Sequence, residues 1–191
     1  MVLPINLLSQ YGCFSDDELF TFCRMNPDLR IERDEDGQLF FGLPDGLEHS
    51  FFNASLMVEV GSWNRQTRLG RISDSNGGYT LPDTSMRAPD LAWVSHERLA
   101  VVPPDNLKKF AYVCPDFVIE LVSESDDLAH LKRKMVKYMA NGVRLGWLID
   151  PFGHQIFIYR PNQEPEMKAF DDELSGKDVL PGFTLRLSQL K

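Results

Sequence analysis

The sequence has few cysteines and no long apolar run. Its three cysteines, Cys13, Cys23 and Cys114, are widely spaced and include no CxxC pair. They argue against a disulfide framework or a zinc site and are expected to be reduced, mostly buried thiols. No apolar segment approaches the roughly 20 residues that a membrane helix needs, and the first residues lack the basic segment of a signal peptide. These absences predict a cytoplasmic protein that does not enter a membrane.

Basic residues are also scarce, because 20 Lys and Arg stand against 28 Asp and Glu, for a formal net charge of -8. Affinity for nucleic acid comes largely from cations that replace counterions along the phosphates. The charge balance therefore counts against nucleic-acid binding unless the bases gather on one face. The length of 191 residues fits a single domain over residues 1–191.

Motifs of several enzyme classes are missing. There is no Walker loop, since Gly77-Gly78 is interpreted as a turn, and there is no GxSxG nucleophile elbow. The four histidines have no metal-ligand spacing and are interpreted as surface or internally bonded residues. A Walker-type nucleotide site, a serine hydrolase and a histidine metal site are therefore disfavoured. The four histidines are His49, His96, His130 and His154.

Capping and turn signals define an N-terminal helix-hairpin region over about residues 1–45. Ser15 and Glu18 form a capping box for a helix that should end before Pro27. Residues 31–41 then form an expected pair of strands folded about Asp36-Gly37, a hairpin turn signal.

The remaining elements follow from apolar periodicity. Gly70 is expected to end a long helix, and Ser123 or Ser125 to cap a later one. The order predicts an α+β (or α/β) fold with a central mixed sheet that carries helices on its faces. The expected helices cover residues 50–67 and 125–140, and the expected strands cover 71–73, 79–81, 90–94, 117–122, 144–150, 155–159 and 179–187, the last with Pro181-Gly182 inside it.

Glu120 lies inside the apolar segment FVIELV (residues 117–122), which is predicted to be a central strand. A carboxylate in such a strand is costly unless it is paired, hydrogen-bonded or bound to a metal. A solvent-facing Glu120 would require polar alternation, but Val118 and Val122 share its face and are apolar. We therefore favour a functional role for Glu120.

Asp90 opens another predicted strand after Pro89. Pro-Asp is a common turn pair, so Asp90 alone is weak evidence of a site. On neighbouring strands, Asp90 and Glu120 could together hold a hard cation such as Mg²⁺, or Mn²⁺ in its place. Such a cation polarises a phosphodiester and lowers the pKa of a bound water.

The helix after Glu120 carries four bases. On a helical wheel, Arg133 and Lys137 point away from its apolar stripe and are interpreted as solvated. Lys132 and Lys134 flank the stripe, where a buried stem can carry an ammonium toward the sheet edge. For these two lysines, a solvated face and a place in the site both stay open.

Taken in order, these segments resemble a large bacterial family of restriction-endonuclease-like proteins, formerly a domain of unknown function, within the PD-(D/E)XK nuclease superfamily. The resemblance covers nearly the whole chain. The matching stretches are NPDLRIER (26–33), RAPDLAWVS (87–95), CPDFVIELVSESDDL (114–128), KMVKYMANGVRLGWLIDP (134–151) and VLPGF (179–183).

The resemblance implies a restriction-endonuclease-like fold and an acidic site of Glu32, Asp90 and Glu120, with Lys134 as the basic partner. The superfamily places its lysine two residues after the acid, where this chain has Val122, and Lys134 of the next helix would replace it. The resemblance also implies possible pairing into homodimers. Secondary candidates for phosphate contacts are Lys132, Arg133, Lys137, Tyr138, Arg65, Arg68 and Arg71.

The leading interpretation is a magnesium-dependent endonuclease that hydrolyses phosphodiester bonds of DNA. One alternative is a catalytically inactive nucleic-acid-binding or regulatory module of the same fold. Another is a small-molecule phosphohydrolase that uses the same acids, which the net acidity of the chain favours slightly.

Overall fold

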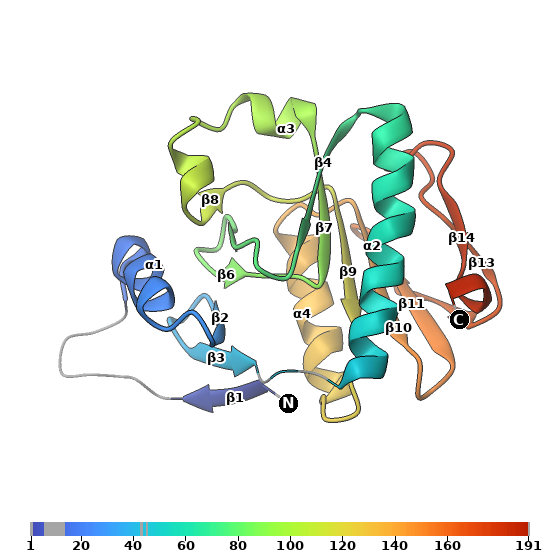
Figure 1. Cartoon of the computed structure of the whole chain (residues 1–191), viewed down its shortest axis with the longest axis horizontal. Helices are drawn as coiled ribbons and strands as arrows, with labels where there is room; N and C mark the ends of the chain where they lie inside the picture. The colour runs from blue at the N-terminus through green and yellow to red at the C-terminus, as the bar shows by residue number, and fades with distance from the viewer. Residues whose placement is uncertain (1, 6–13, 43, 45, 191) are drawn as a thin grey trace.

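The computed structural model describes residues 2–5, 14–42, 44 and 46–190, with side chains from residue 14 onward (Figure 1). The helices are α1 (Asp16–Met25), α2 (Leu47–Thr67), α3 (His96–Ala100) and α4 (Leu128–Ala140), with 3-10 turns η1 (Asn106–Lys108) and η2 (Leu187–Leu190). The strands are β1 (Val2–Ile5), β2 (Arg30–Arg33), β3 (Leu39–Gly42), β4 (Gly70–Asp74), β5 (Tyr79–Thr80), β6 (Met86–Arg87), β7 (Leu91–Ser95), β8 (Ala111–Tyr112), β9 (Phe117–Leu121), β10 (Leu145–Asp150), β11 (Gln155–Tyr159), β12 (Glu166–Ala169), β13 (Glu173–Ser175) and β14 (Thr184–Arg186).

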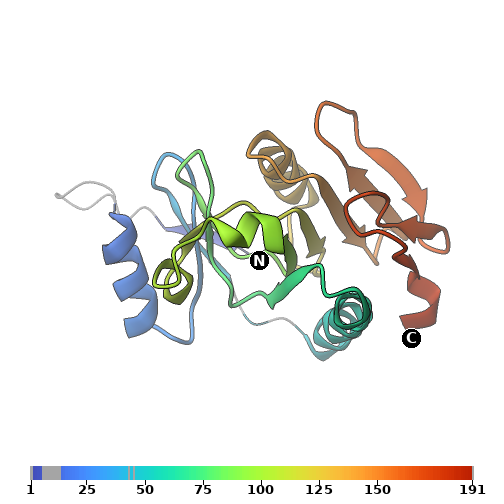
Figure 2. The ribbon, with the colours of Figure 1, turned by 90° about the horizontal axis from the view of Figure 1, so that it is seen from above.

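A mixed sheet of order β12-β11-β10-β9-β7-β4 forms the centre of the fold. Strands β9 and β10 run parallel, and their other neighbours are antiparallel. Helices α2 and α4 cover opposite faces of this sheet (Figures 1 and 2). Every residue of β9 and β10 is buried, as their continuous apolar sequences predict. The expected α+β fold with a central mixed sheet is confirmed.

A second sheet, of order β1-β3-β2-β6-β5-β8, carries the N-terminal region. Helix α1 begins with the predicted capping box, in which the Glu18 carboxylate accepts the Ser15 N–H at 2.8 Å. The helix ends at Met25, before Pro27, and strands β2 and β3 form the predicted hairpin. Leu19 of α1 packs on the apolar side of this hairpin in a small cluster of its own. The sequence patterns did not predict β1, β6, β8, β12, β13 or α3.

Gly70 does not end helix α2, contrary to expectation. Arg68 caps the helix in the left-handed conformation, with φ 55°, and its N–H donates to the Asn64 carbonyl. Gly70 instead opens β4, where an added Cβ would lie 2.2 Å from the Val94 carbonyl oxygen and 2.7 Å from the Trp93 ring. The glycine is needed for close packing between strands rather than for the helix end.

Helix α4 is capped by Asp127, whose carboxylate accepts the Ala129 N–H, so the prediction of Ser123 or Ser125 was wrong. Ser123 is engaged elsewhere, because its N–H and its hydroxyl both donate to the Asp126 carboxylate. That turn delays the helix by about three residues relative to the predicted start at residue 125. The predicted end at Asn141-Gly142 is confirmed.

The last strand is shorter than predicted. Pro181-Gly182 forms a turn with Gly182 at φ 76°, and β14 begins only at Thr184. The turn is held against helix α2, because the Trp63 indole N–H donates to the Pro181 carbonyl at 3.0 Å. The C-terminal segment thereby covers one end of the core on the α2 face.

Within the described residues, no helix has both the length and the apolarity to cross a membrane. Cys23 and Cys114 are free, partly buried thiols, and burial raises the pKa of each to about 11. Both therefore stay protonated and unreactive near neutral pH. The expectation for Cys13 concerns a residue that lies outside the described ranges.

Candidate active site

Asp90 and Glu120 face each other across two antiparallel strands. Leu91 of β7 pairs with Ile119 of β9, so the next position of the same register sets Asp90 opposite Glu120. Directly opposite residues of an antiparallel pair project to the same face. Both carboxylates are buried, with exposed fractions of 7% for Asp90 and 4% for Glu120. The two acids therefore come together at one end of adjacent strands, although Asp90 stands one residue before β7 and not inside the strand that was predicted over residues 90–94.

Backbone and side-chain donors hold Asp90 in place. Its Oδ2 accepts the Leu121 N–H at 2.9 Å, and its Oδ1 lies 3.1 Å from the Arg30 guanidinium. Because Leu121 follows Glu120 directly, the first of these bonds ties the two strand ends together at the site. The Leu121 carbonyl lies 3.1 Å from His49 Nε2, so the same residue is also held from helix α2.

Lys134 bridges two of the acids from helix α4. Its Nζ lies 2.8 Å from Glu120 Oε1 and 2.9 Å from Glu32 Oε1. The lysine is only 8% exposed, so its ammonium is withdrawn from solvent with its partners. Tyr138, one helical turn later, donates its hydroxyl to Glu120 Oε1 at 2.9 Å. Of the two lysines left open by the helical wheel, Lys134 is the one that reaches the acids.

Glu32 comes to the site from strand β2 of the other sheet. Its Oε1 accepts the Ala88 N–H at 2.8 Å, and its Oε2 lies 3.6 Å from the Arg87 guanidinium. The structure therefore brings together Glu32, Asp90, Glu120 and Lys134 from four separate segments of the chain.

The two acids that share Lys134 differ in proton affinity. Burial, together with the nearby Asp90 and Glu32 charges, outweighs the effect of Lys134 and raises the pKa of Glu120 to about 7. Burial would also raise the pKa of Glu32, but Lys134 and Arg87 outweigh it and lower that pKa. Glu120 is therefore the acid that can hold a proton near neutral pH, whereas Glu32 stays ionised.

Lys134 and Tyr138 both keep their protons near neutral pH. Although burial opposes it, Glu120 and Glu32 raise the pKa of Lys134 above its usual value. Burial, with Glu120 and Glu32, raises the pKa of Tyr138 well above 10. Near neutral pH the site thus contains a charged lysine and a neutral phenol that donates a hydrogen bond.

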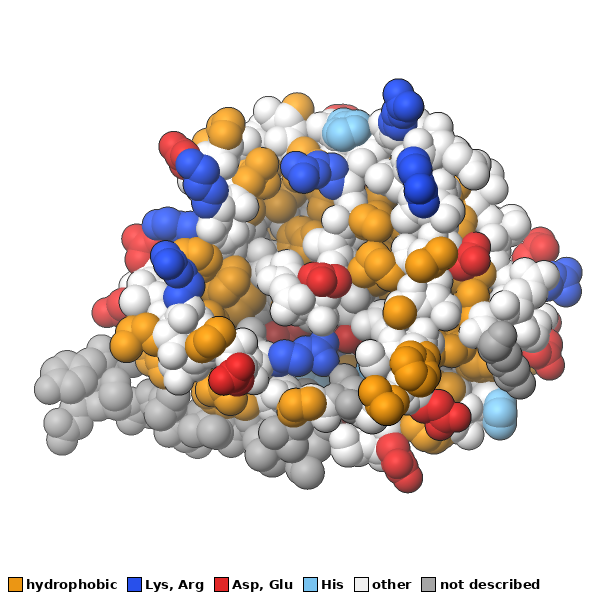
Figure 3. Space-filling model, viewed as in Figure 1, with side chains coloured by type: hydrophobic (Ala, Val, Ile, Leu, Met, Phe, Trp, Pro, Cys, Tyr) orange, Lys and Arg blue, Asp and Glu red, His pale blue; other side chains and the backbone are white. Residues whose placement is uncertain are grey.

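A cavity of about 210 Å³ is lined by Glu32, Asp90, Glu120 and Lys134, and it opens in the hollow at the centre of the face in Figure 3. Two basic side chains, Arg30 and Lys134, line it against four acids. With His49 counted as neutral, the lining carries a formal charge of -2. The four lining acids are Glu32, Asp90, Glu120 and Asp126.

The arginines expected near the acids lie elsewhere. Arg71 pairs with Val94, roughly 13 Å along strand β7 from Asp90. Arg65 and Arg68 lie at the C-terminal end of helix α2, and all three arginines are exposed. The expectation that this group gathers at the acidic site was wrong, because the α2–β4 connection carries it to the far end of the sheet.

The other candidate contacts of helix α4 divide into three kinds. Arg133 is exposed and lies 3.8 Å from Asp127, as its solvated position predicts. Lys132 stacks its ammonium 3.9 Å above the Phe157 ring, away from the acids. Tyr138 is fully buried, so it positions Glu120 instead of meeting a phosphate at the surface.

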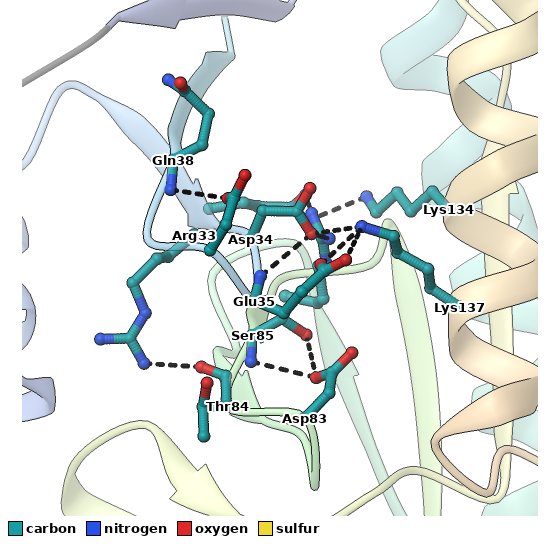
Figure 4. A network of polar contacts seen from close by, with 12 residues as sticks. Arg33, Asp34, Glu35, Gln38, Asp83, Thr84, Ser85, Lys134 and Lys137 are labelled. Carbon is teal, nitrogen blue, oxygen red and sulfur yellow. Dashed lines mark hydrogen bonds and ion pairs between the residues drawn. The ribbon is translucent and has the colours of Figure 1, made fainter. Parts of the chain in front are cut away.

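Lys137 was interpreted as solvated, and this was wrong. Its Nζ lies 2.7 Å from Asp34 Oδ1 and 2.5 Å from Glu35 Oε2, both at the tip of the β2–β3 hairpin (Figure 4). The helical wheel places Lys137 correctly away from the apolar stripe. It does not reveal that a second sheet covers that side of the helix.

Sequence reasoning also missed Arg87 and Arg30, which neutralise Glu32 and Asp90. Arg87 is 3% exposed and bonds Asp34 as well as Glu32. The only sequence signal was position, since Arg87 stands three residues before Asp90 and Arg30 two residues before Glu32.

The acids of the site are oxygen donors, the kind of ligand that a hard divalent cation prefers. Across the residues that the structure describes, no three or more His, Cys, Asp or Glu side chains are arranged to hold a metal ion. Asp90 and Glu120 offer two carboxylates on one face. Mg²⁺ is often held by one or two carboxylates and keeps several of its waters, so this donor set fits it.

The fold of this chain is shared with a solved structure. The chain is similar to a crystal structure titled as "a putative nuclease belonging to DUF820" from Anabaena variabilis ATCC 29413. The TM-score is 0.70, the sequence identity is 21%, and the match covers 84% of this chain and 88% of the other. At this identity the likeness establishes a shared fold.

The family follows from the sequence. The model of the Uma2 family, described as "Putative restriction endonuclease", matches residues 16–188, and the chain belongs to this family. A search among curated proteins finds no match. The resemblance expected from the sequence is confirmed at the level of family and fold.

Proposed function

We propose that the protein is a magnesium-dependent endonuclease that hydrolyses phosphodiester bonds of DNA in the cytoplasm. The observation that carries this proposal is the pair of buried carboxylates, Asp90 and Glu120, opposite each other on one sheet face, with Lys134 at 2.8 Å from Glu120. Membership of the Uma2 family supports a nucleic-acid substrate.

Asp90 and Glu120 would hold the cation, which when bound would supply an activated water and a counter-charge for the phosphate. Lys134, withdrawn from solvent, presents an ammonium where negative charge increases during hydrolysis, and low local polarity strengthens its effect. Glu32 and Tyr138 orient Lys134 and Glu120 through the hydrogen bonds described above.

The direct test is cleavage of supercoiled plasmid DNA by the purified full chain. We expect nicked and linear products with Mg²⁺ or Mn²⁺, and none after EDTA is added. Titration of each metal by calorimetry, without DNA, checks the site separately. Absence of both cleavage and metal uptake would replace this proposal with a catalytically inactive binding module.

Metal uptake should strengthen as pH rises through about 7. The raised pKa of Glu120, about 7, means that a proton competes with the cation below that pH and no longer competes above it. We expect the calorimetric Kd for Mg²⁺ to be roughly 10-fold weaker at pH 6 than at pH 8. A Glu120→Gln variant, which has no such proton to release, should show weak binding with little pH dependence. An equal Kd at both pH values in the wild type contradicts the assignment of Glu120 as a ligand.

One feature favours a second candidate, hydrolysis of a small phosphoester. The cavity lining carries a formal charge of -2, whereas DNA binding usually depends on Lys and Arg. A bound Mg²⁺ would cancel that charge. Plasmid DNA and bis(p-nitrophenyl) phosphate, assayed side by side with Mg²⁺, separate the two functions, since the second candidate predicts turnover of the small diester alone.

A further inference from the structure

A chain of ion pairs runs from the acidic site to the protein surface. Charges of opposite sign alternate along it. Its outermost side chains, Lys137 and Glu35, are 32% and 42% exposed, whereas Arg87 in its middle is 3% exposed. Figure 4 shows its outer part, where both lysines of helix α4 reach toward the hairpin. From the site outward, the residues of this series of ion pairs are Glu120, Lys134, Glu32, Arg87, Asp34, Lys137 and Glu35.

Two ion pairs, Lys134 with Glu32 and Lys137 with Asp34, connect helix α4 to the end of strand β2. Lys134 and Lys137 are three residues apart on α4 and so lie on the same side of it. Glu32 and Asp34 are two residues apart and both face the helix, one bound to each lysine. Arg87 lies between the two acids and contacts both.

One ring contact joins the hairpin to helix α4, between Phe40 and His130, whose ring centroids lie 5.3 Å apart. The other apolar side chains of the hairpin belong to neither core of the central sheet, since they cluster with Leu19 and Met86; they are Ile31, Leu39 and Phe41. Strand β2 pairs with β6 at a single position, Arg33 with Met86. Glu32 itself is held at the junction by polar contacts, with Lys134, Arg87 and the Ala88 N–H.

We propose that Lys137, with Asp34 and Glu35, is a clamp that holds the β2–β3 hairpin on helix α4 and thereby positions Glu32 at Lys134. Among the described residues, the ion pairs of Lys137 are with Asp34 and Glu35 and not with Glu32, Asp90 or Glu120, so it acts as a positioning residue. The catalytic consequence rests on the function proposed above, whereas the structural consequence does not.

The structural consequence is tested by amide hydrogen exchange, without DNA or metal. The Ala88 N–H donates to Glu32 Oε1, so its exchange reports whether Glu32 is in place. The Leu121 N–H donates to Asp90 and serves as an internal control on the other side of the site. In Lys137→Glu we expect Ala88 to exchange at least about 10-fold faster while Leu121 is unchanged. Unchanged exchange at Ala88, or an equal increase at both amides, overturns the clamp.

Variants with matched charge separate the clamp from a general loss of basic surface. Lys137→Glu combined with Glu35→Lys restores an ion pair and should recover most of the protection at Ala88. Arg133→Glu changes the charge of the same helix at an exposed position and should leave Ala88 unaffected. Failure of the double variant to recover any protection also counts against the clamp.

The catalytic consequence is tested by cleavage kinetics with the same variants. We expect kcat to fall about 10-fold in Lys137→Glu with little change in KM, because a displaced Glu32 disturbs Lys134 but not substrate contacts. If the wild type cuts no DNA, the proposed function fails, while the exchange data still decide the clamp. If Ala88 exchange rises in Lys137→Glu but kcat does not fall, Glu32 placement has no role in catalysis and that part of the inference is wrong.

Discussion

Glu120→Gln is expected to lower kcat/KM for magnesium-dependent DNA cleavage by about 1,000-fold or more. The substitution keeps the shape of the side chain and removes the charge that would hold the cation. Tyr138 can still donate to the amide oxygen, and Lys134 keeps Glu32 as a partner, so the fold should persist. Cleavage kinetics and circular dichroism of the same preparations measure the two effects.

Asp90→Asn should give a loss of the same order, because its partner position across the strands makes it the second carboxylate of the pair. Asp105→Asn is a suitable control, since Asp105 is 88% exposed and pairs with the exposed Lys108 at the surface. Near-normal cleavage by both Asp90→Asn and Glu120→Gln would falsify the two-carboxylate site, whatever the control does.

Lys134→Met should have the largest effect on stability. It removes the cation that lies between Glu32 and Glu120 and leaves two carboxylates without that partner in a buried site. Breaking a buried pair in this way costs roughly 3–5 kcal/mol, and the free energy of unfolding, measured by urea titration without metal, should fall by about that amount. Catalysis should be lost as well, while uptake of Mg²⁺ survives because both ligand carboxylates remain.

Mg²⁺ should restore part of the lost stability in Lys134→Met, because a cation that binds only the folded state adds to its free energy of unfolding. Arg133→Met, one residue away and exposed, is the matched control and should change stability by less than about 0.5 kcal/mol. A Lys134→Met protein as stable as the wild type would mean that the three-residue ion pair does not form in solution.

The central part of the site could be predicted from sequence because its signal is local. Glu120 interrupts an apolar strand, and the absence of polar alternation around it already indicates a buried carboxylate with a functional role. The main elements of the central sheet followed from apolar runs and from turn residues such as Gly37, which lies at φ 85°. For Glu32 and Lys134 as site residues, the family resemblance was needed.

The rest depends on contacts between distant segments, which no local pattern encodes. Arg87 meets Asp34 53 residues away, and Lys137 meets Glu35 at a separation of 102 residues. A helical wheel can only say which side of α4 is polar, and it cannot show that the hairpin covers that side. Likewise, the sequence around Gly70 is typical of a helix end. Only the fold shows that the Trp93 ring packs against Gly70 and leaves no room for a Cβ.

The same separation has a consequence for the order in which a new chain matures. The hairpin that carries Glu32 is synthesised about 100 residues before Lys137, an interval on the order of 5–20 s at ordinary translation rates. During that time its acids have no partners on α4, and the segment must rely on its small cluster with α1. The acids and the lysine can therefore meet only after most of the central sheet has been made. A ribosome-bound chain that ends before α4 carries no assembled centre.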